Sequence, residues 1–262
     1  MNRFKGGIIV FFTTAAIYWL IASQNQDKKG LVTYTDGEVK HRTTQEEIWQ
    51  DAPVNTEIIS GDKVRTYRQS RAELDLAEMD IIRLAPRTIV DVVKLYEETK
   101  DSKLQTSLNL EEGELWASVH KVESDTKFDI SAPIAAAAIT GTVLRMKVGD
   151  DTTTQLKVYE GEVEIRKKET ALVQPVPMQS LKPTEVPGPT EVQGPHEVTA
   201  DEWVKIVKAM QQITISKKGE IISWSGFSPD DEEEKTDWVQ WNQNLDRLRQ
   251  LRLENMKKRL NR

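Results

Sequence analysis

The sequence predicts a mainly β protein, and two features of its 262 residues carry that prediction. Apolar and polar residues alternate in several short runs, such as Glu73–Leu76 and Glu162–Arg166, which is typical of strands with one buried face. Glycine next to an acidic residue separates such runs, as at Gly113 and Gly161, and both residue types suit turns. Strands of this length are not stable singly, so they must stack into a sandwich, barrel or solenoid.

Composition limits the function classes. The net charge of -6 argues against a nucleic-acid surface, because neutralising phosphates requires clustered Lys and Arg. Cysteine is absent, which excludes disulfides, thiolate nucleophiles and Cys-ligated metals. The length allows one or two domains.

The N-terminal segment, residues 1–24, is predicted to be a membrane anchor. Gly6–Ala22 carries no charge, and at about 1.5 Å per residue a helix of this length just crosses a bilayer. Tyr18 and Trp19 lie near its end, where aromatic rings favour the interface. A cleaved signal peptide is the alternative, although Leu20 fits the cleavage rule poorly. Basic residues flank both sides equally, so the charges do not decide the orientation.

Residues 31–168 carry the β pattern. Turn glycines with a structural role are expected in it, since glycine adopts positive φ and allows another backbone to approach closely. The glycines selected for this role are Gly61, Gly113, Gly141 and Gly161.

Nine motifs within residues 31–168 resemble, in their order, the motifs of the FecR domain. Each is weak alone, whereas nine in the right order are a specific signal. They are Asp36–Val39, Trp49, Ile58–Thr66, Ser70–Leu74, Ile82–Thr88, Leu110–Leu115, Phe128–Pro133, Ile139–Thr142 and Val158–Val163.

The resemblance implies a bacterial, extracytoplasmic, solenoid-like β domain, best known as the periplasmic arm of regulators that signal to a cytoplasmic sigma factor. Those regulators carry an anti-sigma segment before the membrane helix, whereas here only Met1–Lys5 precede the predicted anchor. We therefore expect a stand-alone FecR-domain protein, single-pass in the cytoplasmic (inner) membrane, with most of the chain in the periplasm or outside the cell.

Residues 169–198 are predicted to be a Pro-rich linker. Three copies of a Pro-x-Glu-Val-x-Gly motif or a near variant begin at Pro183, Pro189 and Pro195. A proline every six residues without an apolar face favours an extended spacer over a packed core, and ligand docking by the repeats is the alternative.

Residues 199–262 are predicted to be a small α+β unit. The capping-box pattern Thr199–Glu202 predicts a helix with Trp203, Ile206, Val207 and Met210 on one face.

A hairpin is predicted next, over residues 213–223, followed by a long helix that starts near Ser228 and ends the chain. Four tryptophans of this unit are candidates for a partner-binding aromatic face, and core packing is the alternative. They are Trp203, Trp224, Trp238 and Trp241.

The sequence contains no recognisable catalytic or cofactor motif. The three histidines lie far apart without metal-ligand spacing, and glycine loops for nucleotides are absent. Acidic clusters such as Asp230–Glu234 lack the calcium-loop spacing and suit turns or a helix N-terminus. We therefore expect no enzyme activity, no cofactor and no metal.

Two functions fit these features. The first is a non-enzymatic protein-interaction or sensing module of the bacterial envelope, with an envelope protein as partner and with self-association through the C-terminal helix as a further hypothesis. The second is a scaffold that binds envelope polysaccharide or peptidoglycan. Exposed Trp49 and Trp116 on the β domain would favour the second, because aromatic rings stack on sugars.

Overall fold

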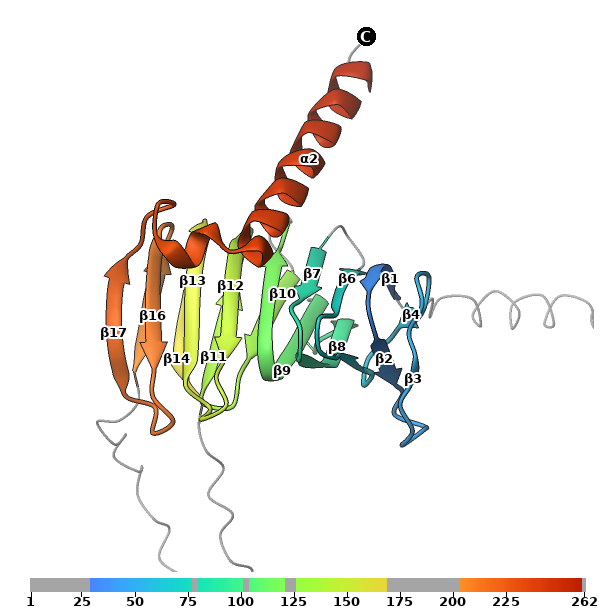
Figure 1. The fold of residues 1–262 in the computed structure, drawn as a ribbon, viewed down its shortest axis with the longest axis horizontal. Helices are drawn as coiled ribbons and strands as arrows, with labels where there is room; N and C mark the ends of the chain where they lie inside the picture. The colour runs from blue at the N-terminus through green and yellow to red at the C-terminus, as the bar shows by residue number, and fades with distance from the viewer. Residues whose placement is uncertain (1–28, 77–79, 101–103, 121–125, 169–202, 261–262) are drawn as a thin grey trace, which may run out of the picture.

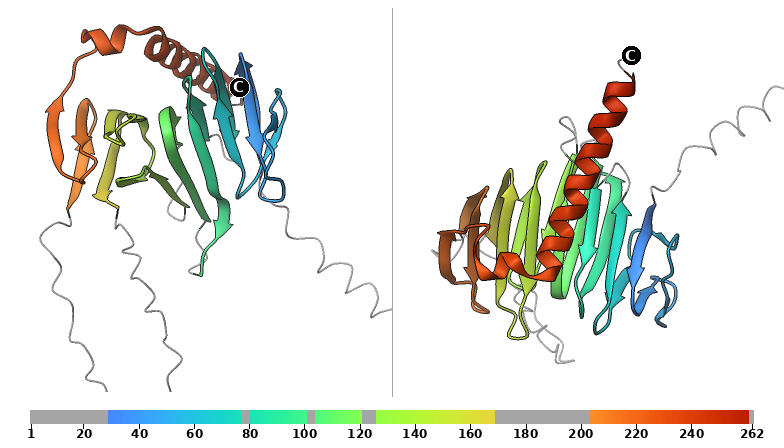
Figure 2. Two further views of the ribbon diagram at one scale, coloured as in Figure 1. Left: turned by 60° about the horizontal axis from the view of Figure 1, so that its bottom comes forward. Right: turned by 45° about the horizontal axis from the view of Figure 1, so that its top comes forward.

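The computed structural model describes residues 29–76, 80–100, 104–120, 126–168 and 203–260. The described strands form two layers with a shared apolar core, and one long helix crosses the outer side of one layer (Figures 1 and 2). The prediction of a mainly β protein is confirmed. The solenoid arrangement stays a prediction.

The first layer carries the helix. Every strand pairing in it is antiparallel. Its strands, in spatial order, are β4 (Glu57–Ile58), β1 (Gly30–Asp36), β6 (Arg71–Leu76), β7 (Asp80–Leu84), the end of β9 (Leu104–Ser118), β12 (Val143–Val148), β13 (Thr154–Glu160), β16 (Gln211–Ile215) and β17 (Ile221–Gly226).

The second layer is antiparallel except for the parallel pair of β9 and β10. Its strands, in spatial order, are β3 (Gln50–Asp51), β2 (Val39–Arg42), β5 (Lys63–Thr66), β8 (Ile89–Glu98), the start of β9, β10 (Thr126–Ser131), β11 (Ala135–Ile139), β14 (Glu162–Lys167) and β15 (Val204–Lys208).

The core lies between the layers, where the alternating runs point their apolar residues. Leu74 of β6 and Ala117 of β9 are buried from the first layer, and Ile130, Val163 and Ile165 from the second. Burial of these side chains holds the layers together, at roughly 25 cal/mol per Å² of apolar surface removed from water.

Strand β9 joins the two layers. Its first part pairs with β8 and β10, and its last part pairs with β7 and β12. The change of layer occurs at Gly113, which has a φ of 89°. A Cβ at this position would lie 2.5 Å from the carbonyl oxygen of Arg87, so only glycine fits without a shift of the backbone.

The predicted helix over Thr199–Met210 is wrong for the described residues, because Val204–Lys208 forms strand β15. Val207 pairs with Val163 of β14 and is buried, whereas Ile206 points outward and is exposed. Tertiary pairing decides the outcome here, and β-branched residues suit a pleated, half-buried surface.

The hairpin predicted next is present as β16 and β17. Strand β16 pairs with β13 and strand β15 with β14, so both extend the two layers instead of forming a separate unit. The backbone N–H of Lys167 donates to the carbonyl oxygen of Trp203 at 3.3 Å, so the last residues of β14 and the residue before β15 lie side by side.

The long C-terminal helix is α2 (Asp237–Leu260), and a short 3₁₀ helix, η2 (Glu232–Lys235), precedes it. The helix therefore begins nine residues after Ser228, where the sequence predicted its start. Its first turns lie on the first layer, and its end extends past the strands (Figure 1). Every side chain from Glu254 to Arg259 is exposed.

No helix among the described residues is long and apolar enough to cross a membrane. The predicted anchor, Gly6–Ala22, and the whole predicted linker, residues 169–198, lie outside the described residues.

We predict that Gly113→Ala lowers the free energy of unfolding by about 2–4 kcal/mol, because the new Cβ meets backbone and the left-handed φ is strained. Urea unfolding measures the change. Gly226→Ala is the matched control, since its Cβ would make only an ordinary contact, 3.6 Å from the oxygen of Met210. The role of Gly113 would be contradicted if both variants changed stability equally.

Candidate protein-interaction site

A row of four buried side chains, three of them cations, crosses the outer face of the first layer. Successive cross-strand partners, which point to the same face, are Arg83 of β7, Trp116 of β9, Arg145 of β12 and Lys157 of β13. All four are buried, with Arg83 and Trp116 1% exposed and Lys157 2%. Outward-facing cations are normally solvated, so something must cover this row.

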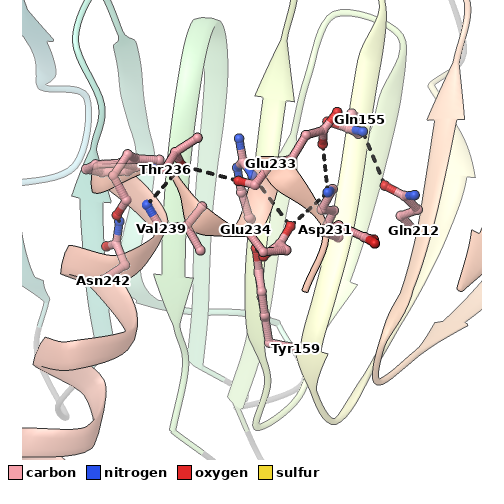
Figure 3. A network of polar contacts seen from close by, with 12 residues as sticks. Gln155, Tyr159, Gln212, Asp231, Glu233, Glu234, Thr236, Val239 and Asn242 are labelled. Atoms are coloured by element: carbon pink, nitrogen blue, oxygen red, sulfur yellow. Dashed lines mark hydrogen bonds and ion pairs between the residues drawn. The ribbon is translucent and has the colours of Figure 1, made fainter. Parts of the chain in front are cut away.

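The short helix η2 covers one end of the row. Lys157 Nζ lies 2.8 Å from Glu233 Oε2 and 2.8 Å from Glu234 Oε1. The Tyr159 hydroxyl donates to Glu234 Oε2 at 2.8 Å (Figure 3). Burial of the Tyr159 side chain has the largest effect on its pKa, and the hydrogen bond to Glu234 has the next largest. Both raise the pKa of Tyr159 far above its ordinary value, so the hydroxyl keeps the proton that it donates. Arg145 Nε donates to Glu114 Oε1 at 2.6 Å.

Helix α2 covers the other end. Asp246 accepts from Arg83 Nη1 at 2.7 Å with one oxygen and from Trp116 Nε1 at 2.8 Å with the other. Arg83 Nε also donates to Glu73 of β6 at 2.7 Å. Asp237, at the start of the helix, pairs with Arg71. Carboxylates of the C-terminal segment therefore hold the helix on the strands.

Two of the predicted partner-binding tryptophans, Trp238 and Trp241, form the apolar part of this contact. Their rings stack with centroids 5.5 Å apart, and Trp238 is buried with Val239 against Trp116. Trp241 is half-buried and packs on Tyr34 of β1, at 5.4 Å between centroids. Both rings therefore pack against other parts of this chain, which is the core-packing alternative to a partner-binding face.

The other two candidates lie elsewhere, at the end of the layers formed by β15 and β17. Trp203 is half-buried, and its Nε1 donates to the carbonyl oxygen of Gly219 at 2.9 Å. Trp224 is 45% exposed, with Lys205 Nζ 5.8 Å from its ring centroid. The structure therefore does not bring the four tryptophans together on one face.

The four glycines expected to have a structural role all adopt a left-handed conformation. Their φ values are 87° for Gly61, 89° for Gly113, 62° for Gly141 and 80° for Gly161.

Trp116 is not available to stack on sugar rings. An exposed Trp116 would have favoured a polymer-binding scaffold. It is 1% exposed, and its ring packs on Tyr159 with centroids 4.4 Å apart. Trp49 is half-buried, with the Arg42 guanidinium 5.2 Å from its ring centroid.

The end of α2 presents apolar side chains to solvent. We call residues 247–259 the projecting helix. Leu248 is 57% exposed, Leu251 50% and Met256 49%. Among the described residues, no group of three or more His, Asp or Glu side chains is placed to hold a metal ion. The exposed apolar side chains make the projecting helix a candidate interaction site.

We predict that Asp246→Ala loosens helix α2. The change leaves the Trp116 N–H without its acceptor and removes one of the two carboxylates on buried Arg83, at a cost of about 2–5 kcal/mol. Amide hydrogen exchange over residues 237–250 should accelerate. The control is Glu254→Ala, in an exposed position of the same helix, and equal effects of the two changes would contradict the prediction.

We predict that Glu233 makes a pH-dependent contribution to the free energy of unfolding. Its hydrogen bond with Lys157 lowers the pKa of Glu233 below the ordinary 4.5, against the opposing effect of burial. Because the folded pKa is lower than the unfolded one, this contribution is complete above the unfolded pKa and is lost as the pH falls through the folded pKa. Between about pH 6 and about pH 3, wild type should therefore lose more stability than Glu233→Gln.

Urea unfolding at several pH values measures this loss. Glu232→Gln is the control, since Glu232 pairs with the exposed Lys235. Identical pH profiles for wild type and Glu233→Gln would contradict the prediction.

This chain is similar to one protein family and to two solved structures. Two crystal structures of "a putative anti-sigma factor from Parabacteroides distasonis ATCC 8503", at 2.50 Å and 1.65 Å resolution, are similar to this chain with 14% identity and TM-scores of 0.43 and 0.42. Each match covers 63% of this chain and 59% of that one. No curated protein matches. Residues 62–164 match the family described as FecR protein, which confirms the resemblance to the FecR domain over these residues.

Proposed function

We propose that this protein is a membrane-tethered, extracytoplasmic FecR-domain protein that acts without catalysis as a protein-interaction or sensing module of the bacterial envelope. The observation that carries the proposal is the projecting helix, which exposes apolar side chains to solvent while buried charges hold its base. The match of residues 62–164 to the FecR family supports a regulatory role.

The projecting helix suits a helix-in-groove contact. Leu248 and Leu251 lie three residues apart, so they share one side of the helix, and each is at least half exposed. Helices recognised by protein grooves insert apolar anchors with this spacing. Because Asp246 and Glu234 already fix the base of α2, binding would require little further ordering of the helix.

The membrane location rests on the sequence. We propose that Gly6–Ala22 anchors the chain in the inner membrane and that the FecR domain lies outside the cytoplasm. This placement favours an envelope protein as the binding partner. A second copy of the chain is the alternative partner. No observation favours the polymer scaffold, since the buried Trp116 removes one of the two aromatic side chains on which it depended.

We predict that a photo-crosslinking amino acid in place of Leu251, in the full chain in its native membrane, gives a discrete protein adduct. The adduct should survive a glycan-degrading enzyme, and Leu248→Asp should weaken it about fivefold or more, because a charge would replace an apolar anchor. Gel analysis and mass spectrometry identify the adduct.

The control places the crosslinker at Glu164, an exposed position on the outer face of the second layer. An adduct with twice the mass of the chain would assign the partner as a second copy. Absence of any adduct, equal adducts from both positions, or loss of the adduct on glycan digestion would overturn the proposal.

A further inference from the structure

An open groove of about 890 Å³ lies beside the base of α2. Register brings its walls together, because Leu84 of β7 pairs with Leu115 of β9 and Val148 of β12 pairs with Gly113. The turns that follow β5, β7 and β12 therefore meet the bend of β9 at one end of the layers. Trp238 of α2 lines the same groove.

Backbone hydrogen bonds tie the turns to one another. The N–H of Arg87 donates to the carbonyl oxygen of Tyr67 at 3.1 Å, and the N–H of Ala85 donates to that of Glu114 at 2.9 Å. The Arg65 guanidinium lies 4.8 Å from the ring centroid of Tyr67, which restricts that side chain as well. The groove is therefore a preformed surface and not a gap between mobile loops.

The groove carries an excess of positive charge in a chain whose net charge is -6. Of its three lining carboxylates, Glu114 is already bound by Arg145, which leaves Glu112 and Asp150. Four lining cations have no carboxylate of the described chain within ion-pair distance. They are Arg65, Arg68, Arg87 and Lys147.

Arg87 is held in an unfavourable backbone conformation at the rim of the groove. Its φ is 57°, in the left-handed region that glycine and asparagine tolerate better than arginine. Gln69, in the turn after β5, has a φ of 54°. Strained conformations of this kind persist where the surrounding structure fixes them, and they cluster at functional sites. An arginine thus occupies a position whose backbone conformation would suit asparagine better.

We propose that this groove binds an acidic peptide segment of a protein partner, with Arg68, Arg87 and Lys147 contacting its Asp or Glu carboxylates. Arginine matches a carboxylate with two parallel hydrogen bonds, which gives geometric specificity as well as affinity. The site lies apart from the projecting helix, so the inference goes beyond the function proposed above.

A peptide fits this lining better than a uniformly anionic polymer does. Glu112 and Asp150 would repel the regular phosphates of a nucleic acid, whereas a peptide can place a donor or a basic side chain against them. The exposed Pro86 supplies apolar surface for side chains between the acidic ones, beside the mostly buried ring of Trp238.

The test uses fluorescence anisotropy with the full chain in detergent micelles at low salt. The probe is an eight-residue labelled peptide with four glutamates, and its matched peptide carries glutamine at those four positions. We expect the glutamate peptide to bind at least about tenfold more tightly, and raising the salt to weaken it.

Arg68→Gln and Arg87→Asn should each weaken binding of the glutamate peptide, together by about tenfold. Arg87→Asn should leave the thermal midpoint unchanged or higher, because asparagine suits the left-handed backbone, and this separates lost binding from misfolding. The matched control is Arg166→Gln, at an exposed position on the outer face of the second layer, which should bind as wild type does.

Equal binding of the two peptides, or unchanged binding by the groove variants, would overturn the inference. Preferential binding of a single-stranded oligonucleotide or a sulfated polysaccharide over the glutamate peptide would also overturn it. Leu248→Asp should leave peptide binding intact, so failure of the groove and failure of the projecting helix are distinguishable.

Discussion

Three buried cations on one face of a sheet, Arg83, Arg145 and Lys157, determine how the C-terminal part of this protein is arranged. A buried cation without a partner is costly, by several kcal/mol even after relaxation. Glu73 and Glu114 of neighbouring strands supply some of the negative charge, and the C-terminal segment supplies the rest. If helix α2 left the strands, the row of cations would be exposed and the carboxylates of the helix would lose their partners.

Charge pairing specifies the position of α2 more than apolar area does. The apolar contact consists mainly of Trp238 and Val239 against Trp116 and Ala85, with Trp241 at the margin. Apolar burial is non-directional, whereas hydrogen bonds require particular atoms in particular places. Asp246 shows this most clearly, because its two oxygens are shared between a guanidinium on one strand and an indole on the next.

Much of the fold could be predicted from local patterns. Alternation located strands such as β6 and β14, and Gly161 located the turn between β13 and β14. Gly113 was expected to separate two strands, but it lies inside β9 at the change of layer. The helix prediction for the segment around Val207 was wrong, because its apolar spacing fits both a helix and a strand. Pairing with β14 decides between the two. The buried row could not be predicted either. Lys157 has the outward position of a solvated lysine, and its partner Glu234 is 77 residues away.

The contact between Lys167 and Trp203 bears on how this gene can change. The two strands that flank residues 169–202 are already side by side, so the chain leaves and re-enters the fold at one point. The entropy of closing a loop grows slowly, by about 0.6 kcal/mol for each doubling of its length. Tandem copies of the Pro-x-Glu-Val motif could be gained or lost by replication slippage with almost no penalty to folding. A change in the number of repeats should therefore leave the layers on either side the same.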